Sequence, residues 1–198
     1  LERIEGTDYY FLDQEHLGEA VYQLPLGMHW PVVYMNTLLQ DTDAEPESRN
    51  DEAAFLNGDS LLMVSGTERY GTIQEELPGI YAVKPLDMDS IAAEYTWTWS
   101  VDAAAGQNDR NAARRILYYF LGETAQDILH VQNEGSLPLN RNEMDAYLEI
   151  NQEFSFLKEQ MDAGIPVEFT DSSDFQERLD EDYLKLITDD QALKALDE

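Results

Sequence analysis

The chain contains no cysteine, and it has only 12 basic residues against 41 acidic ones. The absence of cysteine excludes disulfides, thiolate metal sites and cysteine nucleophiles. The formal net charge of -29 repels phosphate backbones, so we expect no binding to nucleic acid. The same charge disfavours electrostatic docking on an anionic membrane.

Long apolar segments are missing as well. No run of the sequence approaches the roughly 18 apolar residues of a membrane-spanning helix, so we expect no membrane insertion by this segment. No signal peptide is recognisable in it. The first residue is Leu1 and not Met, and composition alone leaves the cellular compartment open.

Motifs for covalent and phosphate chemistry are absent too. There is no Gly-x-Ser-x-Gly elbow, and residues 66–71 (GTERYG) lack the Gly-Lys-Ser ending of a phosphate-binding loop. We therefore expect no catalytic residue and no cofactor, and a protein that is not an enzyme. A hydrolase acting through a carboxylate pair stays open as an alternative, because 41 acidic residues offer many such pairs.

The sequence also lacks a recognisable metal site. Residues 41–45 (DTDAE) and 171–174 (DSSD) are rich in carboxylates but have neither the glycine nor the terminal glutamate of a calcium loop. No pair of histidines has the spacing of a helical zinc site. We expect no bound metal, and a surface or capping role for the three histidines, His16, His29 and His130.

What the chain does contain is enough apolar material for a packed core. Apolar residues make up 43% of the 198 residues and charged residues 27%, which is typical of a globular protein. Strand patterns dominate residues 20–101 and helix patterns dominate residues 109–198. We therefore expect one domain over residues 1–198, of the α/β or α+β class.

The expected strands are β-branched or aromatic runs bounded by turn residues. The run at 60–64 is apolar throughout, which indicates a strand buried on both faces, and the run at 95–101 alternates aromatic and hydroxyl side chains. We expect the last three strands to form one sheet, covered by the later helices. The strands are residues 20–26, 30–36, 60–64, 80–84 and 95–101.

The expected helices are marked by capping residues and glycine stops. A long helix begins at Asn108 or Asp109 and ends before Gly122; Ile116, Leu117 and Phe120 lie on one face of it and should be buried. Further helix starts are predicted at capping residues followed by an amphipathic segment. These are Ser48 or Asn50, Asn140 with Glu143, Ser173 with Gln176, and Thr188 with Gln191.

Aromatic residues on the expected strands give the clearest hint of a binding site. Aromatic rings stack on the apolar faces of sugars and close over small ligands. Core filling is the alternative, and for Trp99 and Tyr95 it is the favoured one. The residues predicted to contact a ligand are Trp30, Tyr34, Tyr95 and Trp97.

Read in order, several segments resemble the extracellular solute-binding proteins of ABC transporters, in particular the carboxy-terminal portion of the bacterial sugar-binding type. The likeness runs over about residues 20 to 196. Each segment is weak alone, and their order carries the resemblance. The segments are residues 21–25 (VYQLP), 32–36 (VVYMN), 55–63 (FLNGDSLLM), 81–86 (YAVKPL), 97–103, 112–129, 137–140 (LPLN) and 188–193 (TDDQAL).

The resemblance implies a periplasmic-binding-protein-like sheet covered by helices. The opening βαβ units of the family's first lobe are absent, so the fold would be partial or reduced relative to the two-lobed one. It also implies an extracellular or cell-surface lipoprotein that binds a small polar solute, in the first place a carbohydrate, for uptake through an ABC permease. The alternative is an extracellular protein-interaction module that kept the scaffold and lost the solute.

Overall fold

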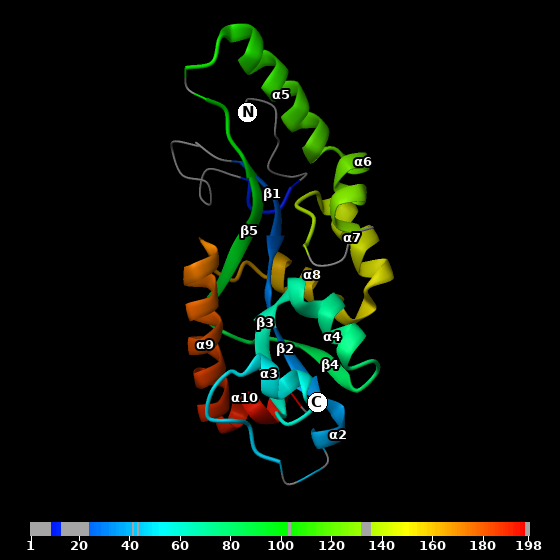
Figure 1. Cartoon of the computed structure of the whole chain (residues 1–198), viewed down its shortest axis with the longest axis vertical. Coiled ribbons are helices and arrows are strands. Elements are labelled where there is room, and N and C mark those ends of the chain that lie inside the picture. Colours follow the sequence, from blue (N-terminus) through cyan, green and yellow to red (C-terminus); the bar gives the residue numbers. More distant parts are fainter. Residues whose placement is uncertain are drawn as a thin grey trace. The chain divides into compact units, whose positions relative to one another are not determined.

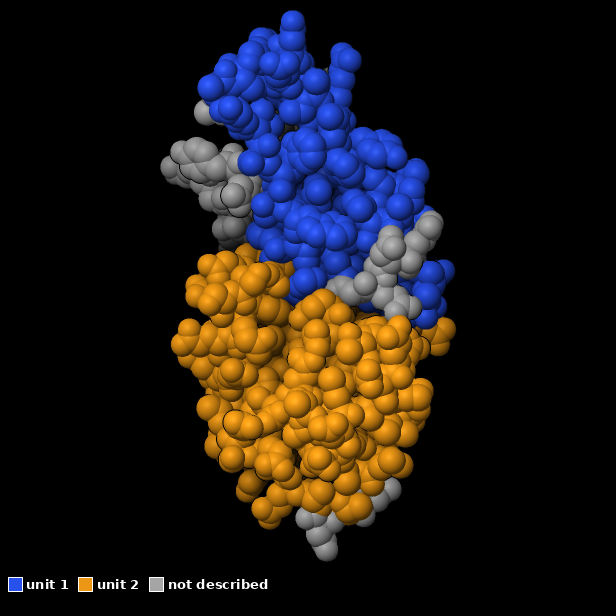
Figure 2. Space-filling view, in the orientation of Figure 1, with its two compact units in different colours: residues 1–29, 95–151 blue, residues 30–94, 152–198 orange. Residues whose placement is uncertain are grey.

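The computed structural model describes residues 9–12, 24–40, 42, 44–102, 104–131 and 136–196. The chain divides into two compact units (Figure 2). Unit 1 comprises residues 1–29 and 95–151, and unit 2 comprises residues 30–94 and 152–198. Each unit is completed by two separate stretches of chain. The expectation of a single domain over residues 1–198 stays a prediction.

Unit 2 is built on a three-stranded antiparallel sheet of order β3-β2-β4. Val33, in the middle of the central strand, lies opposite Val64 on one neighbour and Lys84 on the other. The central strand and β3 are buried along their whole length, whereas β4 is half-buried. The strands are β2 (Pro31–Asn36), β3 (Leu62–Gly66) and β4 (Tyr81–Pro85).

One face of this sheet packs against a long helix, α9 (Ser172–Thr188) (Figure 1). Alternate strand residues point to this face, as the two-residue period of a strand requires. They meet the apolar stripe of the helix, and the contact forms the main core of unit 2. The core residues are Val33, Met35, Leu62, Val64, Leu86, Phe175, Leu179, Tyr183, Leu186 and Leu196.

The opposite face of the same sheet carries an aromatic cluster. The ring centroids of Tyr34 and Tyr81 are 6.4 Å apart, and Tyr70 lies 6.2 Å from Tyr81 and 5.0 Å from Phe154. Tyr70 begins helix α4 (Tyr70–Glu76), which the sequence pattern did not predict. Edge-to-face arrangements of this kind add to the stability gained from burial.

The helix after the acidic loop begins one residue later than expected. Asp51, and not Ser48 or Asn50, caps α3 (Glu52–Leu56) by accepting a hydrogen bond from the Ala54 amide. That bond and the neighbouring Arg49 lower the pKa of Asp51. Asn50 instead pairs with the edge of β3: its amide donates to the Val64 carbonyl at 2.8 Å, and the Val64 amide donates back at 3.1 Å.

Two other predicted helix starts are also displaced towards aspartates. Asp171 caps α9, accepting from the amides of Ser173 and Asp174, so the predicted cap Ser173 lies inside the helix. Asp189, and not Thr188, caps α10 (Asp190–Ala195). Asp and Ser are equally good caps, so the sequence pattern could not rank Asp171 against Ser173, whereas Asp189 is intrinsically a better cap than Thr188.

The rest of unit 2 includes a parallel strand pair that the sequence did not predict. β6 (Val167–Thr170) pairs with the first residues of β5 (Ile91–Trp99), with Ile91 opposite Val167. Gly164 has φ +71°, which suits the turn that follows α8. The remaining elements are α2 (Thr37–Gln40), the short 3-10 segments Thr67–Arg69 and Gln152–Phe154, and α8 (Phe156–Asp162).

Unit 1 contains β1 (Leu24–His29), which neighbours the second half of β5. Residues 20–23 of the predicted first strand lie outside the described residues. Met28 and Leu137 exchange two backbone hydrogen bonds of 3.1 and 2.8 Å, and Tyr10 donates to the Leu139 carbonyl at 2.8 Å. The Leu-Pro-Leu-Asn segment is therefore extended, as the sequence indicates, and bridges two other stretches of unit 1.

The long helix of unit 1 is α5 (Gln107–Leu121). The prediction that Ile116 is buried is wrong: its side chain is 44% exposed, whereas Leu117 and Leu121 are buried and Phe120 is half-buried. The apolar stripe is rotated towards Leu121, and the six residues at the start of the helix are exposed. The apolar stripe in the sequence therefore extends further along α5 than the part of the helix that packs against the rest of unit 1.

Helix α5 ends before Gly122, as expected, and α6 (Glu123–Gln126) follows at once. The chain then forms a π-helical turn (Asp127–Val131). Asn140 caps α7 (Arg141–Ile150) by accepting from the amides of Asn142 and Glu143, which confirms the predicted helix start.

Taken together, the chain has the α/β class that the sequence predicts, with small sheets covered by helices (Figure 1). The finer expectation of one sheet for the last three strands is wrong. β3 and β4 flank β2, whereas β5 belongs to a second sheet with β1 and β6. Strand pairing between distant segments leaves no periodic signal in the sequence, so the sequence did not predict that the strands divide between two sheets.

Candidate functional site

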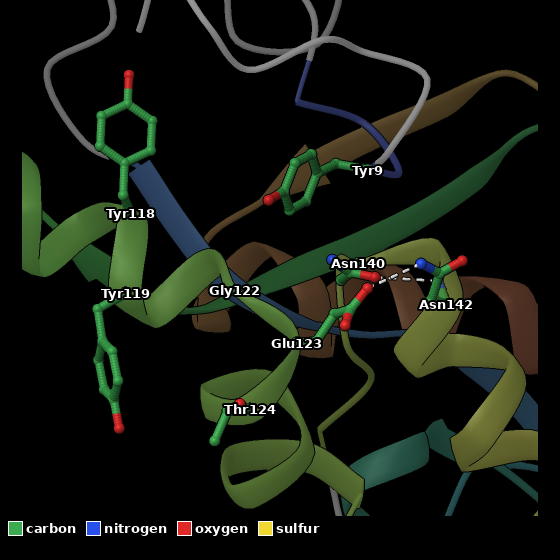
Figure 3. Close-up of a pocket in the computed structure, with 8 residues that line it drawn as sticks. All are labelled: Tyr9, Tyr118, Tyr119, Gly122, Glu123, Thr124, Asn140 and Asn142. Atoms are coloured by element: carbon green, nitrogen blue, oxygen red, sulfur yellow. Dashed lines mark hydrogen bonds between the residues drawn. The ribbon is translucent and has the colours of Figure 1, made fainter.

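Unit 1 has a surface pocket of about 620 Å³ where α5 ends (Figure 3). Its walls come from the last turn of α5, the start of α6, the cap of α7 and residue 9. The lining combines aromatic rings with amide, hydroxyl and carboxylate groups. The lining residues are Tyr9, Tyr118, Tyr119, Gly122, Glu123, Thr124, Asn140 and Asn142.

The local sequence explains why these groups converge. Gly122 stops α5 in an extended conformation, with φ -72° and ψ 154°, so α6 starts in a new direction. The cap of α7 at Asn140 is joined to residue 9 by an antiparallel bridge. The end of α5, the starts of α6 and α7, and one extended segment therefore meet around the pocket.

The polar side chains of the pocket lie close together (Figure 3). Asn142 donates from its side-chain amide to a Glu123 carboxylate oxygen at 3.0 Å, and the Asn140 oxygen accepts from the Asn142 backbone at 3.0 Å. The Tyr9 hydroxyl donates to the Leu121 carbonyl at 3.1 Å. Amide groups carry both donors and acceptors, so this side of the pocket can bind a hydroxylated molecule.

Two tyrosines supply the aromatic surface. Tyr118 is 42% exposed and Tyr119 is 60% exposed, and they leave the last turn of α5 in opposite directions (Figure 3). Neither belongs to the buried stripe of the helix. A pocket lined by both exposed aromatic rings and polar groups suits an amphipathic molecule such as a sugar.

The charged side chain among the described lining residues is a carboxylate, Glu123, and further carboxylates lie near it. Burial raises the pKa of Glu143, and the charges of Asp127 and Glu123 act in the same direction. The guanidinium of Arg141 lies 3.9 Å from the centre of the Tyr10 ring, an arrangement favoured by cation–π attraction. The pocket therefore suits a neutral or cationic solute better than an anion.

A buried polar network holds the elements around the pocket. Gln126 donates to the carbonyls of Leu26 and Phe120, both at 2.9 Å, and accepts from the Leu139 amide at 2.9 Å. His130 lies with Nε2 2.7 Å from the same Leu26 carbonyl. The expectation of a surface or capping role is wrong for His130, because its side chain is fully buried.

Burial decides the protonation of this histidine. Loss of hydration lowers the pKa of His130 to about 4, against a partly compensating effect of the Leu26 carbonyl. The ring is therefore neutral at pH 7. Because a carbonyl only accepts hydrogen bonds, Nε2 carries the ring proton and donates a hydrogen bond to the Leu26 carbonyl.

Two of the predicted ligand contacts, Trp30 and Tyr34, lie in unit 2 and are fully buried. The Trp30 indole donates to the Gln160 side-chain oxygen at 3.2 Å, and the Tyr34 hydroxyl donates to the Gly66 carbonyl at 3.2 Å. The Trp30 amide also donates to the Thr67 hydroxyl at 3.2 Å. The backbone of Trp30 and the side chain of Tyr34 therefore contact the same turn after β3.

The other two, Tyr95 and Trp97, lie in unit 1 on β5. The Tyr95 hydroxyl donates to the Phe11 carbonyl at 3.0 Å. Trp97 has φ +38° and is 59% exposed, and its ring centroid lies 6.2 Å from that of His130. The strict alternation expected along this strand is interrupted here, with Thr96 buried instead. A role of these four aromatics in ligand binding stays a prediction.

Sequence reasoning missed the pocket of unit 1, although one signal was present. Tyr118 and Tyr119 are adjacent aromatics at the end of a helix, and Tyr119 lies on the side opposite the buried stripe. Large aromatics in such positions lack a core function. Asn140 was recognised as a cap, but its approach to Glu123 depends on the fold.

Within the described ranges, no group of three or more His, Cys, Asp or Glu side chains could hold a metal ion. In the same part of the chain, no helix has the length and apolar character needed to cross a bilayer. Part of the acidic loop, residues 41 and 43, lies outside the described residues. Asp171, from the second carboxylate cluster, is engaged as the cap of α9.

No protein-family profile matches the chain, and no curated protein sequence matches it. Its fold is similar to that of the maltodextrin-binding protein MalE1 from L. casei BL23, solved without ligand, with a TM-score of 0.64. The likeness covers 96% of this chain and 74% of that one, at 9% sequence identity. The chain therefore has a fold of the periplasmic-binding-protein type, and the likeness is one of fold.

Proposed function

We propose that the chain binds a small polar solute without chemical conversion, and that the solute is a carbohydrate. The observation that carries the proposal is the fold likeness to a maltodextrin-binding protein over 96% of the chain. The pocket of unit 1 supports it, because exposed tyrosines line it together with amide and carboxylate groups. Uptake through an ABC permease at the cell surface is the physiological setting that we propose.

In this proposal the pocket uses two kinds of contact. The Tyr118 ring stacks on the apolar face of one sugar unit, and Asn140, Asn142 and Glu123 bind hydroxyls on another part of the same oligosaccharide. The negative surroundings select neutral sugars over sugar acids. Trp97 and Tyr95, of the same unit, are proposed as further contacts. Trp30 and Tyr34 belong to unit 2, and their predicted role in ligand binding is a separate proposal.

The test is a panel of neutral mono- and oligosaccharides, measured by shift in Tm and by tryptophan fluorescence. We expect at least one sugar to raise the Tm. Tyr118→Ala should then weaken binding by about 1–3 kcal/mol, the cost of losing one stacked aromatic platform, and Asn142→Ala should weaken it as well. Asn111→Ala, on an exposed turn of α5, is the matched control and should leave affinity unchanged.

A protein-interaction module is the second candidate, favoured by the exposed aromatics of unit 1. Trp97 and Tyr119 are 59% and 60% exposed, and large exposed apolar groups mark interaction surfaces when they gather. A panel without any sugar-induced change in Tm or fluorescence would favour this reading over solute uptake.

A further inference from the structure

Unit 2 has a cleft of its own, of about 380 Å³. It is bounded by the end of β4, by α8 and the turn after it, and by α9 and α10. This volume is within the range of small-molecule sites. The lining residues are Pro85, Asp87, Phe156, Glu159, Gln160, Ala163, Ile165, Leu186, Ala192, Ala195 and Leu196.

The floor of the cleft is apolar. Leu186 and Leu196 are 3% and 6% exposed and belong to the main core of unit 2. Phe156 and Ile165 are half-buried beside them. A hydrocarbon or aryl group placed here would be removed from water on several sides, which favours its binding.

The rim of the cleft is acidic. Asp87 and Glu159 are exposed, and they are the charged side chains among the described lining residues, which include no Lys or Arg. Unit 2 as a whole carries about two thirds of the 41 acidic residues. An anionic ligand is therefore repelled, whereas a cation is attracted to the rim and to its surroundings.

The remaining polar group of the cleft is already positioned by the protein. Gln160 accepts from the Trp30 indole at 3.2 Å and donates to the Leu86 carbonyl at 3.1 Å. These two hydrogen bonds hold the Gln160 amide in place on one side of the cleft. It also links the cleft to a buried tryptophan, whose fluorescence can report on occupancy.

We propose that this cleft binds a small organic ammonium ion with a compact apolar body, such as an aryl-alkyl amine. The apolar body lies on Leu186, Leu196 and Phe156, and the ammonium group lies between Asp87 and Glu159. The site is separate from the sugar pocket of unit 1, so it does not rest on the function proposed above.

The probe is phenethylammonium, titrated into the full chain at low salt by calorimetry and by the intrinsic fluorescence of its three tryptophans, of which Trp30 adjoins the cleft through Gln160. The neutral isostere 2-phenylethanol is titrated in parallel. We expect the amine to bind and the alcohol to bind at least tenfold more weakly. The double variant Asp87→Asn/Glu159→Gln should lower amine affinity about tenfold, as expected for the loss of two exposed charge pairs.

Two controls separate a site from diffuse attraction to an acidic protein. Asp89→Asn and Glu177→Gln remove exposed charges of unit 2 that do not line the cleft, and combined they should change affinity less than twofold. Ala195→Leu should block the cleft without unfolding the chain, because Ala195 is exposed, and should abolish binding of the amine.

Equal losses in the two double variants, equal binding of the alcohol, unchanged affinity in Ala195→Leu, or no binding at all would each overturn the proposal. The sugar panel is read separately. If the amine binds and no sugar does, this inference holds and the proposed function is contradicted. If a sugar binds and the amine does not, the proposed function holds and this inference is contradicted.

Discussion

At the scale of single residues, Gly27 on β1 is tightly enclosed by three different side chains. A Cβ atom at this position would lie 2.3 Å from His130 Cε1, 2.6 Å from Ser136 Oγ and 2.7 Å from Thr96 Oγ1. Thr96 and Ser136 are hydrogen-bonded to each other at 2.9 Å, and the His130 ring is held by the Leu26 carbonyl. None of these atoms can retreat without breaking a buried polar contact.

We therefore expect Gly27→Ala to destabilise the chain by about 1–3 kcal/mol or more, the usual cost of overpacking. Urea unfolding followed by circular dichroism measures the change. The control is Gly106→Ser, at the cap of α5, where a Cβ would lie 3.6 Å from the nearest atom, an Asp109 carboxylate oxygen, and where serine is a favourable residue. Similar losses in both variants would contradict the steric explanation.

His130 should make the stability of the chain depend on pH. Its pKa is about 4 in the folded chain and about 6.5 in an unfolded one. Between these values the unfolded chain binds the proton, so stability is complete above pH 6.5 and is lost as the pH falls towards 4. At pH 5.0 the loss from this residue should be about 2 kcal/mol.

The measurement is the free energy of unfolding at pH 7.0 and pH 5.0, for the natural chain and for His130→Gln. Glutamine can still donate to the Leu26 carbonyl but does not titrate. Other titrating groups affect both proteins alike, so the difference between them isolates the histidine. An equal loss in the two proteins would show that His130 is not the cause.

At the scale of elements, the start of α9 can be tested directly, because the structure has Asp171 as its cap and the sequence pattern predicts Ser173. Asp171→Ala should destabilise the chain by about 0.5–2 kcal/mol, because the amides of Ser173 and Asp174 lose their acceptor. Ser173→Ala should cost less than about 0.5 kcal/mol. The midpoints of urea unfolding measure both changes. A larger loss for Ser173→Ala than for Asp171→Ala would indicate that Ser173 is the cap.

The rotation of the stripe on α5 gives a second comparison within one helix. Leu121 is fully buried and Ile116 is 44% exposed. Leu121→Ala should cost about 2–5 kcal/mol through the cavity that it leaves, whereas Ile116→Ala should stay within about 0.5 kcal/mol. A large loss for Ile116→Ala, in the unfolding midpoint, would mean that this face of α5 is covered in solution.

The sequence predicts elements well where the signal is local. The carboxy-terminal end of α5 follows from Gly122, and the start of α7 follows from Asn140. A glycine stop and a capping residue act on the backbone directly next to them, so both signals are local. The signal fails where the outcome depends on distant segments. β6 and α4 are short elements without a distinctive period, and the assignment of β5 to a second sheet depends on pairing with residues 167–170.

The candidate sites were less predictable than the elements, for the same reason. Both pockets are made where ends of several elements meet, so their members are scattered from Tyr9 to Asn142 in one and from Pro85 to Leu196 in the other. Sequence can indicate that Tyr118 is an unusual helix residue. Only the fold shows that Tyr118 lines one pocket together with Asn140, Asn142 and Glu123.

At the scale of the whole molecule, the dominant property is a net charge of -29. Like charges repel one another in the compact state, and the repulsion is screened when the ionic strength rises. We therefore expect the Tm to rise between 10 mM and 0.5 M NaCl, by about 3–6 °C if the screened repulsion is worth 1–2 kcal/mol. Thermal unfolding followed by circular dichroism at pH 7 measures this shift.

A variant can show that repulsion, and not a specific effect of the salt, causes this rise. Glu75 and Glu76 are exposed at the carboxy-terminal end of α4, where the helix dipole adds to the unfavourable interaction of negative charges. Glu75→Gln/Glu76→Gln should raise the Tm at 10 mM NaCl, and the gain should shrink at 0.5 M because the same repulsion is then screened in the natural chain. A gain independent of salt would point to helix propensity instead, and a Tm that falls with added salt would mean that attractive ion pairs outweigh the repulsion even in so acidic a chain.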